Sequence, residues 1–164
     1  DWSLSYREHP VAIRVPVGVT LPATRPVPTN YSALNTYEVV ERGKDVAILA
    51  LGNFFSLGER VCRLLEAQGI RATLINPRYI SGVDCDLLDS LATDHRLVVT
   101  LEDGALNGGF GEKIARHFGA TGVKTLCYGA KKQFADRYAP QEFLAANRLV
   151  DTMIVEDIMK HSQG

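Results

Sequence analysis

The chain has 164 residues, of which 46% are hydrophobic, and its formal net charge at pH 7 is −1. This length suits one domain with its own core, because a domain near this size buries roughly 68–70% of its unfolded surface. Lysine and arginine are scattered, and the longest wholly apolar run covers only residues 46–51, so nothing in the sequence indicates nucleic-acid binding or membrane insertion.

The first part of the chain has the features of a domain end followed by a linker. Residues 9–16 resemble a strand, but no earlier element is present to pair with it. Four prolines then favour an extended linker: Pro16, Pro22, Pro26 and Pro28. We therefore expect residues 1–17 to be the last strand of a missing domain, residues 18–35 a linker, and residues 36–164 the folded domain.

Two strands and a helix are predicted to open the folded domain. Residues 37–42 and the apolar residues 46–51 are predicted to form an antiparallel pair at the edge of the sheet. Ser56 is the expected N-cap of a helix that ends at Gly69, with Glu59 completing a capping box. Apolar side chains recur at helical spacing along it: Leu57, Val61, Leu64 and Leu65.

A second strand and helix follow, and then a third strand with a glycine-rich turn. Residues 70–76 are predicted to be a strand, and Asp84 is the expected cap of the next helix. Residues 97–101 are apolar apart from Thr100 and are β-branched at Val98, Val99 and Thr100, as in a strand covered on both faces. They lead through Gly108, Gly109 and Gly111 into a helix that Gly119 is expected to end.

The glycine turn has two possible explanations. Glycines allow a helix to pack closely on a strand. Alternatively, the free N–H groups at the start of the helix could bind a phosphate or another anion. The spacing G-G-x-G matches neither the dinucleotide motif nor the P-loop motif, and this favours close packing.

The remaining elements complete an α/β pattern. Residues 123–128 are predicted to be the last strand, Pro140 begins a helix, and a final helix covers residues 151–160. Alternating strands and helices predict a three-layer sandwich, with a mostly parallel five-stranded sheet, one antiparallel edge strand and helices on both faces. Ligands of such sheets lie beyond the carboxyl ends of the strands, which here means residues 52–53, Arg78 and residues 102–111.

Cysteine and histidine give no sign of a metal site. Three widely spaced cysteines without a C-x-x-C motif predict reduced, structural thiols in a cytoplasmic protein: Cys62, Cys85 and Cys127. Four histidines lack the spacing of metal ligands, and we expect neutral surface side chains: His9, His95, His117 and His161. A metal or catalytic-triad role for a histidine is the alternative.

Three segments resemble the carboxy-terminal domain of the 1-deoxy-D-xylulose-5-phosphate synthase family, which belongs to the transketolase superfamily. Residues 43–52, GKDVAILALG, resemble the family's G-K-D-V-A-I-L-A-x-G. Residues 76–84 resemble N-x-R-F-V-K-P-L-D. Residues 99–111, VTLEDGALNGGFG, resemble V-T-x-E-E followed by L-N-G-G-F-G, which is the most specific of the three. The resemblance extends over roughly residues 9–158.

The resemblance also implies which parts of the enzyme are missing. Members of the family hold thiamine diphosphate and magnesium through an N-terminal and a pyrimidine-binding domain, neither of which lies in this chain. The resemblance therefore implies an intact homodimeric parent enzyme that condenses pyruvate with glyceraldehyde 3-phosphate. We expect this chain to contain no catalytic, cofactor-binding or metal-binding residue, and to be inactive by itself.

A few residues remain candidates for lying near the substrate. Residues 12–18 resemble the family's A-x-R-Y-P-R-G, but Val17 replaces the second arginine, which in the family holds the substrate phosphate. The resemblance suggests Arg14, Asn107, Gly108 and Gly109 as the candidates, and the departures suggest a divergent paralogue. Two alternatives are a separately encoded subunit or regulatory module of another transketolase-like enzyme, and an α/β domain with an anion site at residues 108–111.

Overall fold

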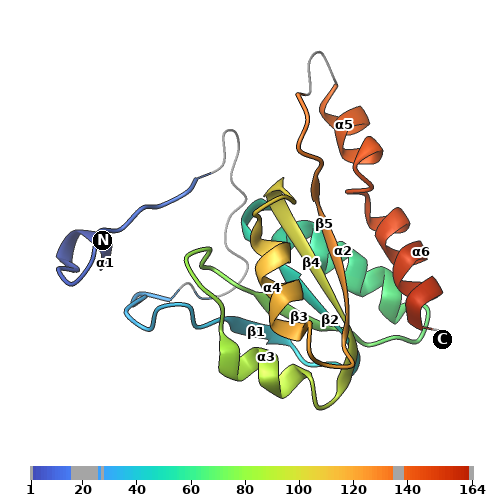
Figure 1. Cartoon of the computed structure of the whole chain (residues 1–164), viewed down its shortest axis with the longest axis horizontal. Helices are drawn as coiled ribbons and strands as arrows, with labels where there is room; N and C mark the ends of the chain where they lie inside the picture. The colour runs from blue at the N-terminus through green and yellow to red at the C-terminus, as the bar shows by residue number, and fades with distance from the viewer. Residues whose placement is uncertain (1, 16–25, 27, 135–138, 163–164) are drawn as a thin grey trace. The chain divides into compact units, whose positions relative to one another are not determined.

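The computed structural model describes residues 2–15, 26, 28–134 and 139–162 (Figure 1). The contacts between residues divide the chain into two compact units, residues 1–34 and residues 35–164. None of the described helices is long and apolar enough to cross a membrane.

The first unit contains one short helix, α1, at Trp2–Ser5. The indole ring of Trp2 packs on Tyr6 and Tyr31, with ring centroids 4.7 and 5.8 Å away, and its N–H donates a hydrogen bond to Ser32. Residues 9–15 form no strand, so the strand predicted there is not formed in this chain. Val17 and most of the predicted linker lie outside the described residues. The division at residues 17 and 35 stays a prediction.

The second unit is built on one five-stranded sheet with the order β1-β3-β2-β4-β5. All neighbouring strands are parallel except β1 and β3, which confirms the predicted sheet with its antiparallel edge strand. The bounds of the strands are β1 Glu38–Glu41, β2 Asp45–Ala50, β3 Thr73–Asn76, β4 His95–Ala105 and β5 Lys124–Ala130.

The predicted pairing of the first two strands is wrong, because β3 lies between them. The connection from β1 to β2 hydrogen-bonds to the chain that enters β3: Gly43 N–H donates to Thr73 Oγ1 at 2.9 Å, and Lys44 N–H donates to the Arg71 carbonyl at 3.0 Å. The apolar strand β2 thereby obtains two parallel neighbours, which bury it inside the sheet.

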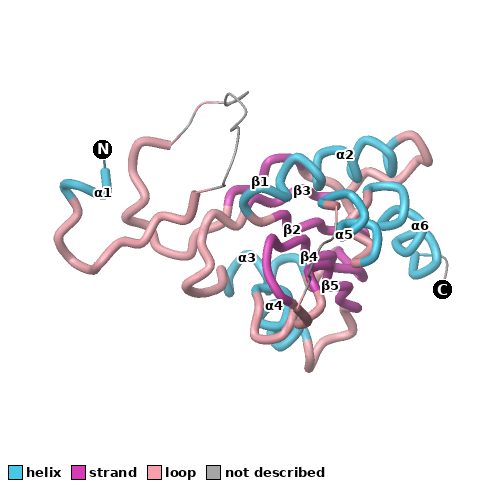
Figure 2. The backbone as a smooth tube through the Cα atoms, turned by 90° about the horizontal axis from the view of Figure 1, so that it is seen from above, coloured by secondary structure: helices cyan, strands magenta, loops and turns pink. Residues whose placement is uncertain are grey.

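Helices cover both faces of the sheet and produce the predicted three layers (Figure 2). Helices α2 (Phe55–Glu66) and α6 (Asp151–Ser162) pack on one face, and α3 (Cys85–Leu91) and α4 (Phe110–Phe118) on the other. The 3₁₀ turn η1 (Gly52–Phe54) precedes α2, and α5 (Pro140–Ala146) precedes α6.

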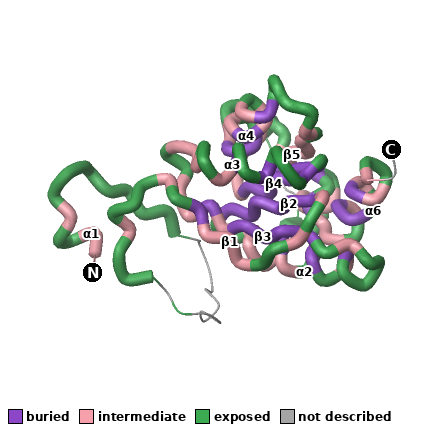
Figure 3. Tube along the Cα trace, turned by 90° about the horizontal axis from the view of Figure 1, so that it is seen from below, coloured by how far each residue is buried: buried purple, intermediate pink, exposed green. Residues whose placement is uncertain are grey.

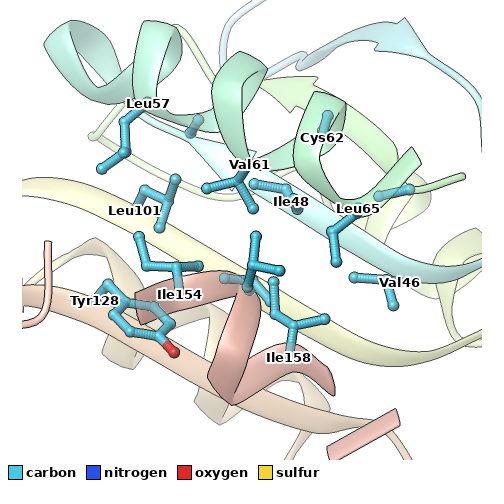
Figure 4. Packing of buried hydrophobic residues seen from close by; sticks show 14 of the residues in the cluster. Val46, Ile48, Leu57, Val61, Cys62, Leu65, Leu101, Tyr128, Ile154 and Ile158 are labelled. Atoms are coloured by element: carbon cyan, nitrogen blue, oxygen red, sulfur yellow. The ribbon is translucent and has the colours of Figure 1, made fainter. Parts of the chain in front are cut away.

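Alternation along the strands supplies one core to each face. Val46, Ile48 and Ala50 face α2 and α6, whereas Ala47 and Leu49 face α3 and α4. The central strands β2, β3 and β4 are accordingly the most continuously buried part of the chain (Figure 3). In the first core, Val61 and Leu65 of α2 meet Ile154 and Ile158 of α6 over the sheet (Figure 4).

The helix ends agree with the sequence in some places and differ in others. Asp84 caps α3, because its carboxylate accepts from the Leu87 N–H at 3.1 Å, and Pro140 begins α5 as expected. Ser56 is not an N-cap, because η1 runs directly into α2 and places Ser56 inside the first turn. Helix α2 ends at Glu66, three residues before Gly69.

Candidate site at the carboxyl edge of the sheet

The glycine-rich turn between β4 and α4 encloses a buried carboxylate. Glu102 is only 4% exposed. Its Oε2 accepts a hydrogen bond from the Phe110 N–H at 2.8 Å, and its Oε1 accepts from the Gly111 N–H at 2.9 Å. A carboxylate from the preceding strand therefore occupies the position in which the amino end of α4 could hold an external anion.

The glycines are required by this close approach. A Cβ atom on Gly109 would lie 2.4 Å from Glu102 Oε2, and one on Gly111 would lie 2.7 Å from Thr100 Oγ1. Gly108 adopts φ of 72°, a conformation that favours glycine, and its N–H donates to Glu112 Oε2 at 2.8 Å. These distances support the close-packing interpretation. The N–H groups of Gly108, Phe110 and Gly111 donate to the chain's own carboxylates, which argues against an anion site in this turn.

The segments predicted to gather at this edge are connected by side chains. Asn53 Nδ2, after β2, donates to Asp103 Oδ2, at the end of β4, at 3.2 Å. Lys113 Nζ of α4 donates to the Ile80 carbonyl, in the loop after β3, at 2.7 Å. Arg78 begins that loop with φ of 61° and donates to the Thr36 carbonyl. Hydrogen bonds thus hold the carboxyl ends of three parallel strands together.

The substrate-proximal candidates fall in both units. Asn107 and Gly108 are exposed in the turn before α4, and Gly109 beside them is partly buried. Arg14 is exposed in the first unit. The three turn residues share one surface and, with Arg14, remain candidates.

The residues of this edge do not fit thiamine diphosphate and its metal. The side chains of Glu102 and Glu112 accept hydrogen bonds from the turn and the start of α4. Both are carboxylates, which repel a diphosphate. Within the described ranges, no group of three histidine, cysteine, aspartate or glutamate side chains is arranged to hold a metal ion.

Two further polar groups correct or refine the predictions for histidine and cysteine. His95 is buried at 4% exposure, not on the surface, and its ring contacts Thr73 Oγ1 at 2.7 Å and Asp94 Oδ1 at 2.6 Å. Burial raises the pKa of Cys62 to about 12, so this thiol stays protonated and unreactive at neutral pH.

Comparison with known proteins shows which family the sequence resembles. The family described as transketolase, C-terminal domain, matches residues 35–149. The 1-deoxy-D-xylulose-5-phosphate synthase of Gloeothece citriformis is 31% identical over 163 residues, covering 96% of this chain and 25% of the relative. That of Rhodococcus erythropolis is 36% identical over 141 residues, covering 83% of this chain and 21% of the relative. The chain thus spans about a quarter of the length of these relatives.

Solved structures of other proteins have a similar fold. A structure described as a split gene transketolase, inactive beta4 tetramer, matches with a TM-score of 0.70 and 28% identity, covering 77% of this chain and 42% of that chain. The transketolase of Campylobacter jejuni matches with a TM-score of 0.54 and 13% identity, covering 82% of this chain and 20% of that chain, and so supports the fold alone. The chain belongs to the transketolase C-terminal domain family.

Proposed function

We propose that this chain is the carboxy-terminal part of a thiamine-diphosphate-dependent 1-deoxy-D-xylulose-5-phosphate synthase. The intact enzyme would condense pyruvate with glyceraldehyde 3-phosphate and release carbon dioxide, supplying isoprenoid and thiamine precursors in the cytoplasm. The observation that carries this proposal is the similarity to synthases of that name over 83–96% of the chain.

Within that enzyme the domain has a structural role. The Glu102 carboxylate and the Asn53–Asp103 and Lys113–Ile80 contacts support a rigid carboxyl edge. Such an edge can position Asn107 and Gly108 against the missing domains, while other surfaces of the unit contribute to a homodimer. Thiamine diphosphate and magnesium belong to the missing N-terminal and pyrimidine-binding domains, and the isolated chain is inactive.

The second candidate is a separately encoded subunit of a split transketolase-like enzyme. The likeness to the structure described as a split gene transketolase favours it. The two candidates predict native polypeptides of different length. One continuous chain, roughly four times as long as this one by its share of the relatives, supports the first candidate, whereas a short chain supports the second.

Reconstitution tests the activity. Release of labelled carbon dioxide from pyruvate is measured with glyceraldehyde 3-phosphate, thiamine diphosphate and magnesium, using this chain alone, the missing domains alone, and both expressed as one polypeptide. We expect turnover only in the joined form. An intact enzyme that transfers a two-carbon unit from ketose phosphates, and does not decarboxylate pyruvate, would overturn the synthase assignment.

A further inference from the structure

A pocket of about 440 Å³ lies at the opposite edge of the sheet, where β2 and β4 begin. The β1–β2 connection, the chain entering β3, and the start of β4 each contribute to it. Its charged or hydroxyl-bearing lining residues are Arg42, Lys44, Asp45, Arg71, Arg96 and Ser162. The Glu102 turn lies at the other end of the parallel strands, so the pocket is separate from the candidate site.

The pocket concentrates positive charge in a chain whose net charge is −1. Four cationic side chains and one carboxylate line the pocket, and the carboxylate is only loosely engaged, with Asp45 Oδ1 3.9 Å from Arg96 Nε. Among the described residues, no ion pair within 4.0 Å neutralises Arg42, Lys44 or Arg71. Cations gathered this closely repel one another, and a bound anion would remove the repulsion.

Backbone hydrogen bonds hold the cationic segments together. Lys44 N–H donates to the Arg71 carbonyl at 3.0 Å, and Asp45 N–H donates to the Asp94 carbonyl at 3.1 Å. Gly43 makes the approach possible, because a Cβ atom there would lie 1.9 Å from the Arg71 carbonyl oxygen. The three strands' entry segments are therefore fixed before any ligand arrives, which reduces the entropy lost on binding.

The buried side chain of His95 links the same segments through hydrogen bonds. Thr73 Oγ1 accepts from the Gly43 N–H and lies 2.7 Å from His95 Nε2, while His95 Nδ1 lies 2.6 Å from Asp94 Oδ1. One consistent assignment has the Thr73 hydroxyl donating to Nε2 and Nδ1–H donating to the Asp94 carboxylate. These hydrogen bonds connect the three segments at the starts of β2, β3 and β4.

We propose that the pocket binds a small organic phosphate, with a diphosphate group held by the arginines. Guanidinium groups bind phosphate oxygens in a bidentate manner, and three of the four cations are arginines. The volume lies within the roughly 300–1,000 Å³ of small-molecule sites. Ile70, which is partly exposed in the lining, offers apolar contact to the organic part. The cations line one half-open pocket rather than an extended basic stripe, which suits a small molecule better than a nucleic acid.

Calorimetric titration of the 164-residue chain at low ionic strength tests this proposal with pyrophosphate, adenosine diphosphate and adenosine as probes. We expect both phosphates to bind and adenosine not to bind. The double variant Arg71→Gln with Arg96→Gln should raise the dissociation constant about tenfold or more, equivalent to ~1.4 kcal/mol. The matched control, Arg116→Gln with Lys132→Gln, removes the same charge from exposed residues outside the pocket and should leave the dissociation constant unchanged.

Circular dichroism shows whether each variant keeps its fold, and Lys44→Gln provides a milder change in the same pocket. Tighter binding of adenosine diphosphate than of pyrophosphate would identify an organic phosphate, whereas equal binding would overturn the organic part of the proposal. Absence of phosphate binding, or equal weakening by pocket and control variants, would overturn the site. The outcome is independent of the synthase assignment, because this assay uses neither substrate nor thiamine diphosphate.

Discussion

At the scale of single residues, Glu102 is the most constrained polar group of the candidate site. Its carboxylate is buried and accepts two backbone hydrogen bonds at the start of α4. Glu112 makes a similar bond to the Gly108 N–H but is exposed. The two glutamates therefore allow the effect of burial to be separated from the effect of capping.

Glu102→Gln should destabilise the chain by about 2–3 kcal/mol, because the amide nitrogen would face a backbone N–H and leave a buried donor unsatisfied. Glu112→Gln should cost about 0.5–1 kcal/mol, since water can replace the lost bond. Urea unfolding measures both changes, and amide exchange at Phe110 and Gly111 locates the first. Equal costs for the two variants would contradict this role of Glu102.

A second polar cluster fastens α6 to the sheet. Tyr128 O–H and Arg148 Nε both donate to Asp157 Oδ2 at 2.9 Å. Burial alone would raise the pKa of Asp157, but the hydrogen bonds from Arg148 and Tyr128 outweigh it and leave that pKa below its ordinary value. Burial raises the pKa of Tyr128, which keeps its hydroxyl available as a donor.

This cluster should make stability depend on pH. Because the folded-state pKa of Asp157 is depressed, its contribution is present above the unfolded value of about 3.9 and is lost as the pH falls through the folded value. Asp157→Asn should therefore cost about 1 kcal/mol at pH 7 and less below pH 4. Urea unfolding at both pH values, with Glu66→Gln as an exposed control, checks this. A cost that stays constant with pH would contradict it.

At the scale of elements, α4 depends on its close contact with β4 and β5. A Cβ atom on Gly111 would lie 2.7 Å from Thr100 Oγ1 and 2.9 Å from the Cβ of Cys127. Both neighbours sit on strands that cannot move without disturbing the sheet. By contrast, Gly122 has no atom within 4 Å of the corresponding position.

Gly111→Ala should therefore destabilise the chain by about 1–3 kcal/mol through overpacking. The added Thr100→Ala change should recover part of that loss, because it removes the nearer obstacle. Gly122→Ala serves as the control and should change stability by no more than about 0.5 kcal/mol. Thermal and urea unfolding of the parent chain, Gly111→Ala, Thr100→Ala and the double variant measure this cycle, and additive effects of the two substitutions would argue against the contact.

At the scale of the whole molecule, the proposed division of the enzyme predicts that the cofactor site for thiamine diphosphate lies outside this chain. A ligand at about 100 times its dissociation constant stabilises the folded state by about 2.7 kcal/mol, and each kcal/mol shifts the melting temperature by roughly 2–4 °C in a domain of this size. True binding would therefore raise the midpoint by about 5–10 °C.

We expect thiamine diphosphate with magnesium to produce no shift in the Arg71→Gln with Arg96→Gln variant, in which binding to the arginine pocket is weakened, and pyrophosphate alone is the control. Thermal melts with each ligand make the comparison, and the enzyme with all its domains is the positive control. A shift of several degrees in that variant with the cofactor, and none with pyrophosphate, would indicate a cofactor site within these 164 residues and would contradict the proposed division of the enzyme.

Local patterns in the sequence were sufficient for the order and type of most elements and for the α/β class. Burial of β2 follows from its apolar run, and Asp84 and Pro140 mark helix starts because capping acts within three residues. The motif around residues 99–111 also identified the family. Such signals are readable because their physical cause lies within a few residues.

Only the tertiary structure decided which distant residues meet. The insertion of β3 between β1 and β2, the Thr73–His95 contact across 22 residues, and the arginine pocket all depend on where the crossovers return the chain. Glu102 was visible as an acidic residue at a strand end, but its partners lie eight and nine residues further along, beyond a turn. Local propensity carries no information about such pairings, because the packing of whole elements determines which polar groups are buried together.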